Sequence, residues 1–396
     1  GIILGKVESF FTTHQDWSFP VPIAYGPGRI NEIADHCLKL GIKHPLIVTD
    51  KGSSELPFLE TLGTYLSKSK IPYNFFKEIS PNPLDSDISA GLKMYREENH
   101  DAVIAIGGGS AMDGGKSICL LANNEYELWD FEFENDAPII GPNEKFPKLI
   151  TIPTTAGTGA ETESTAMVTD TTKGMKFCIW HNDLKPSVAI LDPELTIGLP
   201  ENLTAWTGID AMTHAIEAYL VPDFHPLCDG AAIQGLSLVN KWLPVAVQEP
   251  KNISARGGML VGSCLAGIAF LKGLGLVHAI SHMIGAEFDT QHGLTNAIIL
   301  PKILEYNLPH TPEGTRIMAS AIHLKDTGQQ SFINHINALL DDFKIPTSLS
   351  KIGVPTDCVA RIATKAMQDS AAKTNPVVAS IEDLKELVRS VILKAR

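Results

Sequence analysis

The segment DAVIAIGGGS at residues 101–110 restricts the fold of this chain more than any other stretch. It is an apolar, strand-like run that ends in three glycines, and the helix-like stretch AMDGGKSICLLANN follows directly. Strand-like runs also occur at 44–50, 72–79, 146–155 and 187–200, with helical spacing of apolar residues at 55–69 and 86–100. Strands that alternate with helices in this way predict a parallel sheet covered by helices on both faces.

Two parts of the chain depart from this alternation. Residues 162–180 combine β-branched residues with a DTTKG turn, and we expect a hairpin there that lies over the site. From about Leu203 the strand-like runs fade, and long stretches with helical spacing follow. We therefore expect an α/β domain at residues 1–200 and an all-helical domain at 201–396. A cleft between two such domains is a common place for an active site.

The composition argues against several classes of function. The chain has 32 Lys and Arg against 45 Asp and Glu, and the formal net charge of −13 argues against binding to nucleic acid or anionic membranes. The six cysteines form no CxxC pair, which leaves a thiolate zinc site without support and fits a reducing compartment. We recognise no signal segment, and apolar stretches are broken before the roughly 18 residues of a membrane span. We expect a cytoplasmic protein.

The first candidate for ligand binding is the cluster Gly107, Gly108, Gly109 and Ser110. Glycines let a phosphate approach the backbone, and the helix that follows offers free N–H groups at its N-terminus. The cluster is not the G-x-G-x-x-G fingerprint, because Met112 takes the sixth place, and it is not a P-loop. A tight strand-to-helix turn is the alternative. Asp113 and Lys116 on the same helix are either a surface ion pair or part of the site.

Two further features follow strand ends in the same half of the chain. The segment PTTAGTGAE (153–161), with Thr154, Thr155 and Thr158, offers small hydroxyl and glycine residues that suit a ribose or a diphosphate. A flexible polar loop is the alternative interpretation. Asp50 ends a strand, where a carboxylate can accept hydrogen bonds from ribose hydroxyls and repel a 2′-phosphate, although such a residue is often only a turn former. Ligands of parallel sheets bind at these strand ends.

The helical half contains two pairs of residues at the spacing i, i+4. Asp210 and His214 in GIDAMTHAIEAY point the same way, and so do His278 and His282 in VHAISH. His292 follows after an expected loop. A carboxylate with two or three imidazoles is a ligand set for a divalent first-row metal that keeps an open position for substrate. A lone histidine on an apolar helix is usually a core residue, but four such groups in two pairs favour a metal.

Four motifs together resemble the iron-containing (group III) alcohol dehydrogenases: GGGSAMDGGK, PTTAGTGAE, GIDAMTHAIEAY and GLGLVHAISHMIGAEFDTQHG. They occur in the order and spacing of that family, and the similarity covers nearly the whole chain. The resemblance implies an N-terminal dinucleotide-binding α/β domain and a C-terminal all-helical metal-binding domain, the fold shared with dehydroquinate synthases. It also implies a divalent metal, Fe(II) ahead of Zn or Mn, on the ligands Asp210, His214, His278 and His292.

The same resemblance assigns the other site residues. His282 matches the non-ligand histidine that lies near the nicotinamide in the family, and it is the expected catalytic residue, as a proton relay. The cofactor positions carried over are Asp50, Asn82, Gly109, Ser110, Thr154, Thr155 and Lys176. An acidic residue at the position of Asp50 favours NAD over NADP. Thr165 stands where lactaldehyde reductases of the family carry Asn, so the substrate is left open. Dimers are common in the family, and we expect a homodimer.

The expected function is an NAD(P)-linked, metal-dependent alcohol dehydrogenase or aldehyde reductase, with NAD ahead of NADP as its cofactor. Hydride would pass between the nicotinamide and a small alcohol held on the metal. Alternatives of the same fold are a hydroxyacid–oxoacid transhydrogenase, another polyol dehydrogenase and a dehydroquinate-synthase-like lyase. The lyase would need several Lys and Arg around the metal motifs, where Lys272 is the one obvious cation. A metal- or nucleotide-binding protein without catalytic activity is the alternative of another class.

Overall fold

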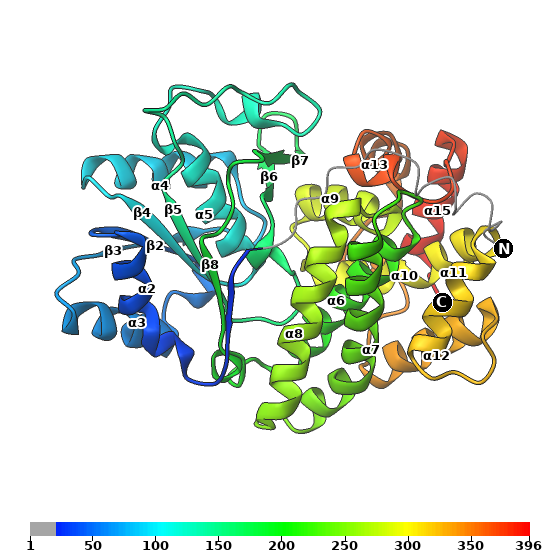
Figure 1. Ribbon diagram of the computed structural model, residues 1–396. Coiled ribbons are helices and arrows are strands. Elements are labelled where there is room, and N and C mark those ends of the chain that lie inside the picture. Colours follow the sequence, from blue (N-terminus) through cyan, green and yellow to red (C-terminus); the bar gives the residue numbers. More distant parts are fainter. Residues whose placement is uncertain (1–20) are drawn as a thin grey trace. The chain divides into compact units, whose positions relative to one another are not determined.

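The computed structural model describes residues 21–396, which form two compact units (Figure 1). The α/β unit comprises residues 21–204 and 245–264, and the helical unit comprises 205–244 and 265–396. The domain limits expected from the sequence, 1–200 and 201–396, remain a prediction, and their first 20 residues lie outside the described part of the chain.

The α/β unit is built on a six-stranded sheet in which every strand pair is parallel. Its strands, in the order β1-β8-β5-β4-β2-β3, are β1 Ile23–Tyr25, β8 Val188–Leu191, β5 Lys148–Pro153, β4 Ala102–Gly107, β2 Pro45–Asp50 and β3 Asn74–Ile79. The predicted parallel α/β architecture is therefore confirmed. Strand β1 was not predicted, because three residues are too few to show an alternating pattern.

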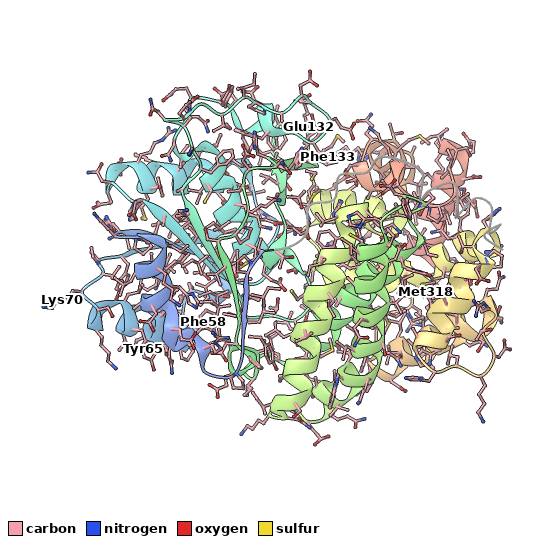
Figure 2. All side chains as sticks on the ribbon, in the orientation of Figure 1. Phe58, Tyr65, Lys70, Glu132, Phe133 and Met318 are labelled. Carbon is pink, nitrogen blue, oxygen red and sulfur yellow. The ribbon has the colours of Figure 1, made fainter. Side chains whose placement is uncertain are left out.

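Helices cover both faces of this sheet, which explains why the inner strands β4 and β8 are apolar and buried along their whole length. They are α2 Ile33–Leu40, α3 Pro57–Lys68, α4 Asp85–Glu97 and α5 Gly109–Ala122. Alternate residues of β4 enter different core layers: Val103 packs with residues of α4 and α5, and Ile104 packs with residues of α2 and α3. Phe58 of α3 belongs to the second of these layers (Figure 2).

The expected hairpin is present as the antiparallel pair β6 Thr165–Asp170 and β7 Met175–Trp180. It is attached to the loop before α4, because the backbone N–H of Thr169 donates to the carbonyl of Pro83 at 2.8 Å. This attachment places the hairpin beside Asn82, one of the predicted cofactor residues.

The strand order reverses between β2 and β4, which is where parallel sheets bind ligands. From β2 the chain continues outward to β3, whereas from β4 it continues in the other direction to β5 and β8. The carboxyl ends of β2 and β4 are Asp50 and Gly107, and the N–H of Gly108 donates to Oδ2 of Asp50 at 3.2 Å. The N–H of Thr154, after β5, donates to the carbonyl of Gly107 at 2.9 Å. Three predicted cofactor segments thus meet at one edge.

After β8, all the regular elements that the structure describes are helices, as predicted for this part of the chain. The α-helices are α6 Glu201–Leu220, α7 Pro226–Gln248, α8 Ile253–Ala269, α9 Leu276–Phe288, α10 His292–Asn307, α11 Pro312–Ala321, α12 Gln329–Asp342, α13 Val359–Met367, α14 Ser370–Lys373 and α15 Ile381–Leu393. Most of them are rich in buried apolar residues, and Met318 of α11 is fully buried (Figure 2).

One helical stretch, Ile253–Lys272, is long and apolar enough to cross a membrane by length and composition, with a mean hydropathy of 1.4. This differs from the expectation that every apolar stretch is interrupted sooner, because small residues such as Gly257 and Ser263 lower hydropathy only slightly. In the structure 67% of its most apolar window is buried. A helix that is apolar on most sides and packed on most sides is typical of a protein core.

The turn at Gly107 provides a test of the fold at the predicted cofactor edge. Gly107 has φ +142°, and an added Cβ would lie 2.5 Å from Oδ2 of Asp50. We expect Gly107→Ala to lower the free energy of unfolding by about 1–3 kcal/mol, because both the backbone and the carboxylate must move. Thermal unfolding measures this change. Gly108→Ala is the matched control, since its added Cβ meets nothing closer than 3.6 Å. Equal melting temperatures for the two variants would contradict the strained turn.

Candidate metal and cofactor sites

One carboxylate and three imidazoles converge inside the helical unit. They belong to Asp210 and His214 on α6, His278 on α9 and His292 at the start of α10, and one ligand atom of each lies within 4.8 Å of the others. The Nε2 atoms of His214, His278 and His292 lie 3.4, 3.5 and 3.5 Å from Oδ1 of Asp210. Ligand atoms about 2.1 Å from a tetrahedral metal are about 3.4 Å apart, so the three Asp–His separations fit a divalent metal.

The electrostatics of the cluster agree with this fit. Burial alone raises the pKa of the Asp210 carboxyl, but His214 and His292 hold that pKa well below its usual range. Burial lowers the pKa of His278, but its hydrogen bonds to Asp210 and Glu217 outweigh burial and raise the pKa to about 9. Asp210 therefore stays an anion, and a metal that binds here must displace a proton from imidazole.

The position of His292 depends on the glycine that follows it. An added Cβ on Gly293 would lie 2.4 Å from the backbone carbonyl of Trp206, so only glycine lets the start of α10 approach α6 this closely. Gln291 caps α10, since its Oε1 accepts from the N–H of Leu294 at 2.7 Å. The short connection after α9 and this close approach direct His292 toward the ligands on α6.

The sequence analysis missed Glu217, which is 4% exposed and lies on the same face of α6 as Asp210 and His214. Oε1 of Glu217 lies 2.6 Å from Nδ1 of His278, and Oε2 accepts from the N–H of Val277 at 2.9 Å. A carboxylate can only accept here, so the proton of neutral His278 sits on Nδ1 and Nε2 is left for the metal. The spacing of seven residues from Asp210 was the available signal for Glu217.

Asn296 is a second residue that the sequence analysis missed, four positions after His292 on α10. Its Nδ2 lies 2.7 Å from Oδ1 of Asp210, 3.3 Å from Nε2 of His278 and 3.2 Å from Nε2 of His292. Its Oδ1 is buried, with no hydrogen-bond partner among the described residues. The amide thus lies directly against the ligand atoms, and its helical spacing from His292 was the signal that could have found it.

His282 lies close to this cluster but outside its ligand set. Its ring is stacked with that of His292 at a centroid separation of 5.8 Å, yet it is not among the four grouped ligands. Its Nδ1 lies 2.9 Å from Oδ2 of Asp369, a buried residue between α13 and α14. No sequence signal links the two, because 87 positions separate them along the chain.

The predicted cofactor residues gather at the carboxyl edge of the sheet in the α/β unit. Asp50 accepts from both the N–H and the hydroxyl of Ser53, at 2.9 and 3.1 Å, besides Gly108. Gly109 lies against Thr158, since an added Cβ would be 2.6 Å from its methyl group. The other predicted residues lie at the end of β4, in the segments that follow β3, β4 and β5, and in the hairpin: Asn82, Gly107, Ser110, Asp113, Thr154, Thr155 and Lys176.

Lys176 joins the hairpin to the loop before α4, because its Nζ donates to Oδ1 of Asn82 at 2.5 Å and both residues are 6% exposed. Burial raises the pKa of Asp113 to about 6, and the positive charges of Lys116 and Lys176 oppose that rise. These contacts bring Asn82, Asp113 and Lys176 into one polar neighbourhood. Their roles toward a cofactor stay predictions.

Lys116 does not form a surface ion pair, which was one of its two interpretations. The residue is completely buried, and its Nζ donates to the backbone carbonyls of Ala160 and Thr165, the latter at 3.1 Å. Lys116 therefore anchors the segment 153–165 to α5. The i, i+3 spacing with Asp113 could not reveal this, because the loop covers the helix only in the folded chain.

Two buried glutamates lie near this lysine. Burial raises the pKa of Glu161 to about 7 and that of Glu163 to about 8, although the charge of Lys116 opposes both shifts. Two buried carboxyls beside one ammonium cannot both ionise without a cost, and this predicts that the stability of the fold depends on pH.

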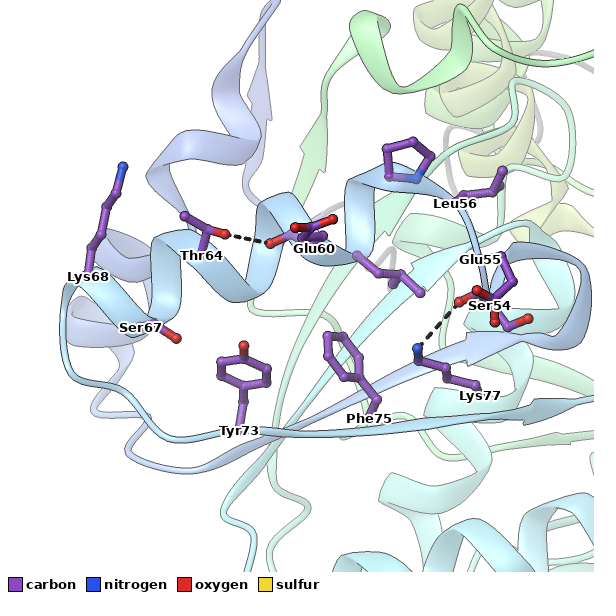
Figure 3. A pocket seen from close by; sticks show the side chains of 12 residues that line it. Ser54, Glu55, Leu56, Glu60, Thr64, Ser67, Lys68, Tyr73, Phe75 and Lys77 are labelled. Atoms are coloured by element: carbon purple, nitrogen blue, oxygen red, sulfur yellow. Dashed lines mark hydrogen bonds between the residues drawn. The ribbon is translucent and has the colours of Figure 1, made fainter.

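A groove of about 790 Å³ lies elsewhere in the α/β unit, between α3 and the edge strand β3 (Figure 3). Phe75 and Lys77 of β3 and Tyr73, just before it, point into the groove, and the Nζ of Lys77 donates to the carbonyl of Ser54 at 3.3 Å. None of the predicted cofactor or metal residues lines it. We therefore do not assign the chemistry to this groove.

Glu217→Gln tests how His278 is held. Gln keeps an acceptor for the helix N–H groups but loses the charge, and we expect Zn²⁺ to bind about 10–100-fold more weakly, as competition with a chelator would measure. Glu217→Ala should weaken binding further. Glu287→Gln on α9, the helix of His278, is the control, because Glu287 pairs with Arg361 and not with a metal ligand. Unchanged affinity in Glu217→Gln would contradict this role.

Glu163→Gln tests the buried carboxyls. The folded protein keeps a proton on Glu163 up to about pH 8, whereas the unfolded chain releases it near pH 4.5. Rising pH between these values therefore destabilises the fold, and the variant avoids this loss. We expect the difference in melting temperature between Glu163→Gln and the parent to rise by about 2–4 °C, in favour of the variant, from pH 6 to pH 9. The exposed Glu125→Gln should show no such trend, and parallel curves for Glu163→Gln and the parent would refute the shift.

Comparison with known proteins identifies the family of the chain. Residues 20–193 match the family of iron-containing alcohol dehydrogenases, and residues 204–392 match the C-terminal domain of the same family. The chain is 32% identical over 382 residues to an NAD-dependent methanol dehydrogenase of Bacillus methanolicus, across 94% of this chain and 98% of that protein.

The fold of this chain is also similar to those of solved structures. A 1,3-propanediol oxidoreductase superposes with a TM-score of 0.90 at 34% identity, across 96% of this chain and 100% of the other. A sulfoacetaldehyde reductase of Bifidobacterium kashiwanohense in complex with NAD⁺ superposes with a TM-score of 0.85 at 29% identity, across 96% and 99%. With both halves of the chain matched, this protein belongs to the iron-containing alcohol dehydrogenase family.

Proposed function

We propose that this protein interconverts a small alcohol and its aldehyde or ketone with NAD as cofactor and a divalent metal, Fe(II), as the electrophile. The observation that carries this proposal is the convergence of Asp210, His214, His278 and His292, with Asp–His separations of 3.4–3.5 Å. A metal held by these residues supplies Lewis acidity toward a substrate oxygen. Zn or Mn would suit the same donors.

The other roles in the proposed reaction belong to side chains of this protein. Asp210 stays anionic and lowers the net charge at the metal position, and Glu217 lies at Nδ1 of His278, so that Nε2 is the nitrogen left for the metal once its proton is displaced. His282 takes up the hydroxyl proton of the alcohol and returns it during reduction. Substrate and cofactor must be oriented so that hydride passes directly between their carbons, which is the contribution of positioning.

NAD is the proposed cofactor. The N-terminus of α5, with Gly109 and Ser110 as its first residues, offers N–H groups to a diphosphate. Asp50 presents a carboxylate at the end of β2, which accepts hydrogen bonds from ribose hydroxyls and repels the 2′-phosphate of NADP. The methanol dehydrogenase is named for NAD, and the reductase binds NAD⁺. The homodimer and the cytoplasmic location stay predictions from the sequence.

The proposal is tested with anaerobically purified protein loaded with Fe(II) or Zn(II). We expect absorbance at 340 nm to change with NAD and a panel of small alcohols, and with NADH and the corresponding aldehydes, and less with NADP. His278→Ala should lose the metal together with more than about 100-fold of the activity, since a metal contributes several kcal/mol to the barrier. His310→Ala, at an exposed histidine, is the control. No absorbance change with any pair, despite bound metal and cofactor, would overturn the proposal.

A further inference from the structure

Helix α9 carries two histidines one turn apart, and each directs Nδ1 to a different buried carboxylate. Nδ1 of His278 lies 2.6 Å from Glu217, and Nδ1 of His282 lies 2.9 Å from Asp369. The Nε2 atoms differ in their surroundings. Nε2 of His278 lies 3.5 Å from Oδ1 of Asp210, whereas His282 is not part of the ligand set around Asp210. The proposed function uses His282, but it assigns nothing to Asp369.

Asp369 is itself held firmly. Its Oδ1 accepts from the N–H of Ala371 at 2.8 Å, which caps α14, and its own N–H donates to the carbonyl of Ala366 at 3.0 Å. Its side chain is 2% exposed. The carboxylate cannot turn away from His282 without losing the helix cap, so Oδ2 is an acceptor at a set position.

We propose that Asp369 is a positioning residue that fixes the ring of His282, with the proton on Nδ1 and with Nε2 free to accept the proton of the substrate hydroxyl. A carboxylate at Nδ1 can only accept, so it selects the tautomer in which Nε2 carries the lone pair. The Asp of a Ser-His-Asp triad acts on its histidine in the same way. This inference rests on the proposed role of His282.

Alcohol oxidation breaks two bonds of the alcohol. The C–H bond of the alcohol breaks, and its electron pair leaves with the hydrogen to C4 of NAD⁺, which is reduced to NADH. The O–H bond breaks, its electrons form the carbonyl, and its proton moves to Nε2 of His282. The proton on Nδ1 stays on His282, hydrogen-bonded to Asp369, and the proton on Nε2 later passes to solvent. Aldehyde reduction runs the same steps backward.

Asp369→Asn and Asp369→Ala separate positioning from a merely structural role. Asn caps a helix as well as Asp does, but its single carbonyl oxygen is needed by Ala371, so its NH₂ group faces Nδ1 of His282. The amide would then select the wrong tautomer, with a proton on Nε2. We expect kcat to fall by about 100-fold in Asp369→Asn, with KM within about 3-fold and metal content unchanged.

Which of the two Asp369 variants loses more kcat tests the inference. Asp369→Ala loses the cap but leaves the tautomer free, so its kcat should fall less, by about 10-fold. If the cap alone matters, Asp369→Ala must be the worse variant, and that order would overturn the inference. Ser380→Ala, which removes the cap of α15, is the control for cap loss away from His282. In a His282→Ala background, Asp369→Asn should add no further loss.

The tautomer is measured directly on metal-free protein with ¹⁵N-labelled histidine, where the signals of His282 are those lost in His282→Gln. We expect the Nδ1–H form in the parent and the Nε2–H form in Asp369→Asn. The Nε2–H form in the parent would overturn the inference. If His282→Ala keeps its activity, the proposed role of His282 fails, while the spectra still report on Asp369. If His282→Ala is inactive but both Asp369 variants turn over normally, only the inference fails.

Discussion

The geometry of the candidate metal site depends on the contacts of the buried Glu217 carboxylate. This carboxylate projects from α6, accepts from the first N–H groups of α9, and holds Nδ1 of His278 at 2.6 Å. A helix N-terminus in a protein core needs acceptors for its free N–H groups, and here the acceptor is the side chain that also orients a metal ligand. Helix packing and ligand geometry therefore cannot vary independently at this position.

In the α/β unit, single buried side chains likewise join separate parts of the fold. Asp50 ends β2, caps the short turn to Ser53 and accepts from the N–H of Gly108, so the strand order and the glycine turn are joined through one carboxylate. Lys116 performs the equivalent task for the loop after β5, since it reaches two backbone carbonyls of that loop from inside α5. Buried charges at both places are stabilised by backbone dipoles rather than by surface ion pairs.

Most of the fold could be predicted from the sequence, because apolar periodicity is local. The strands β2, β4 and β5 and the helices α3 and α4 lie where their patterns indicated, and the hairpin of β6 and β7 follows its turn signal. The short strand β1 was not predicted, because it depends on its pairing with β8 and not on its own sequence pattern. The hydrogen bonds of Lys116 were not predicted for a similar reason, because the carbonyls that accept them lie more than 40 residues away along the chain.

The sequence by itself determined which residue types could hold a metal, since the spacing of Asp210 and His214, and of His278 and His282, places each pair on one face of a helix. It could not separate the roles of His278 and His282 without the family resemblance, because both have the same spacing and the same apolar setting. Only the tertiary structure decided this, by bringing His278 to Glu217 and Asp210 and bringing His282 to Asp369. An imidazole has two nitrogens, and the group that folding places at one of them decides what the other can do.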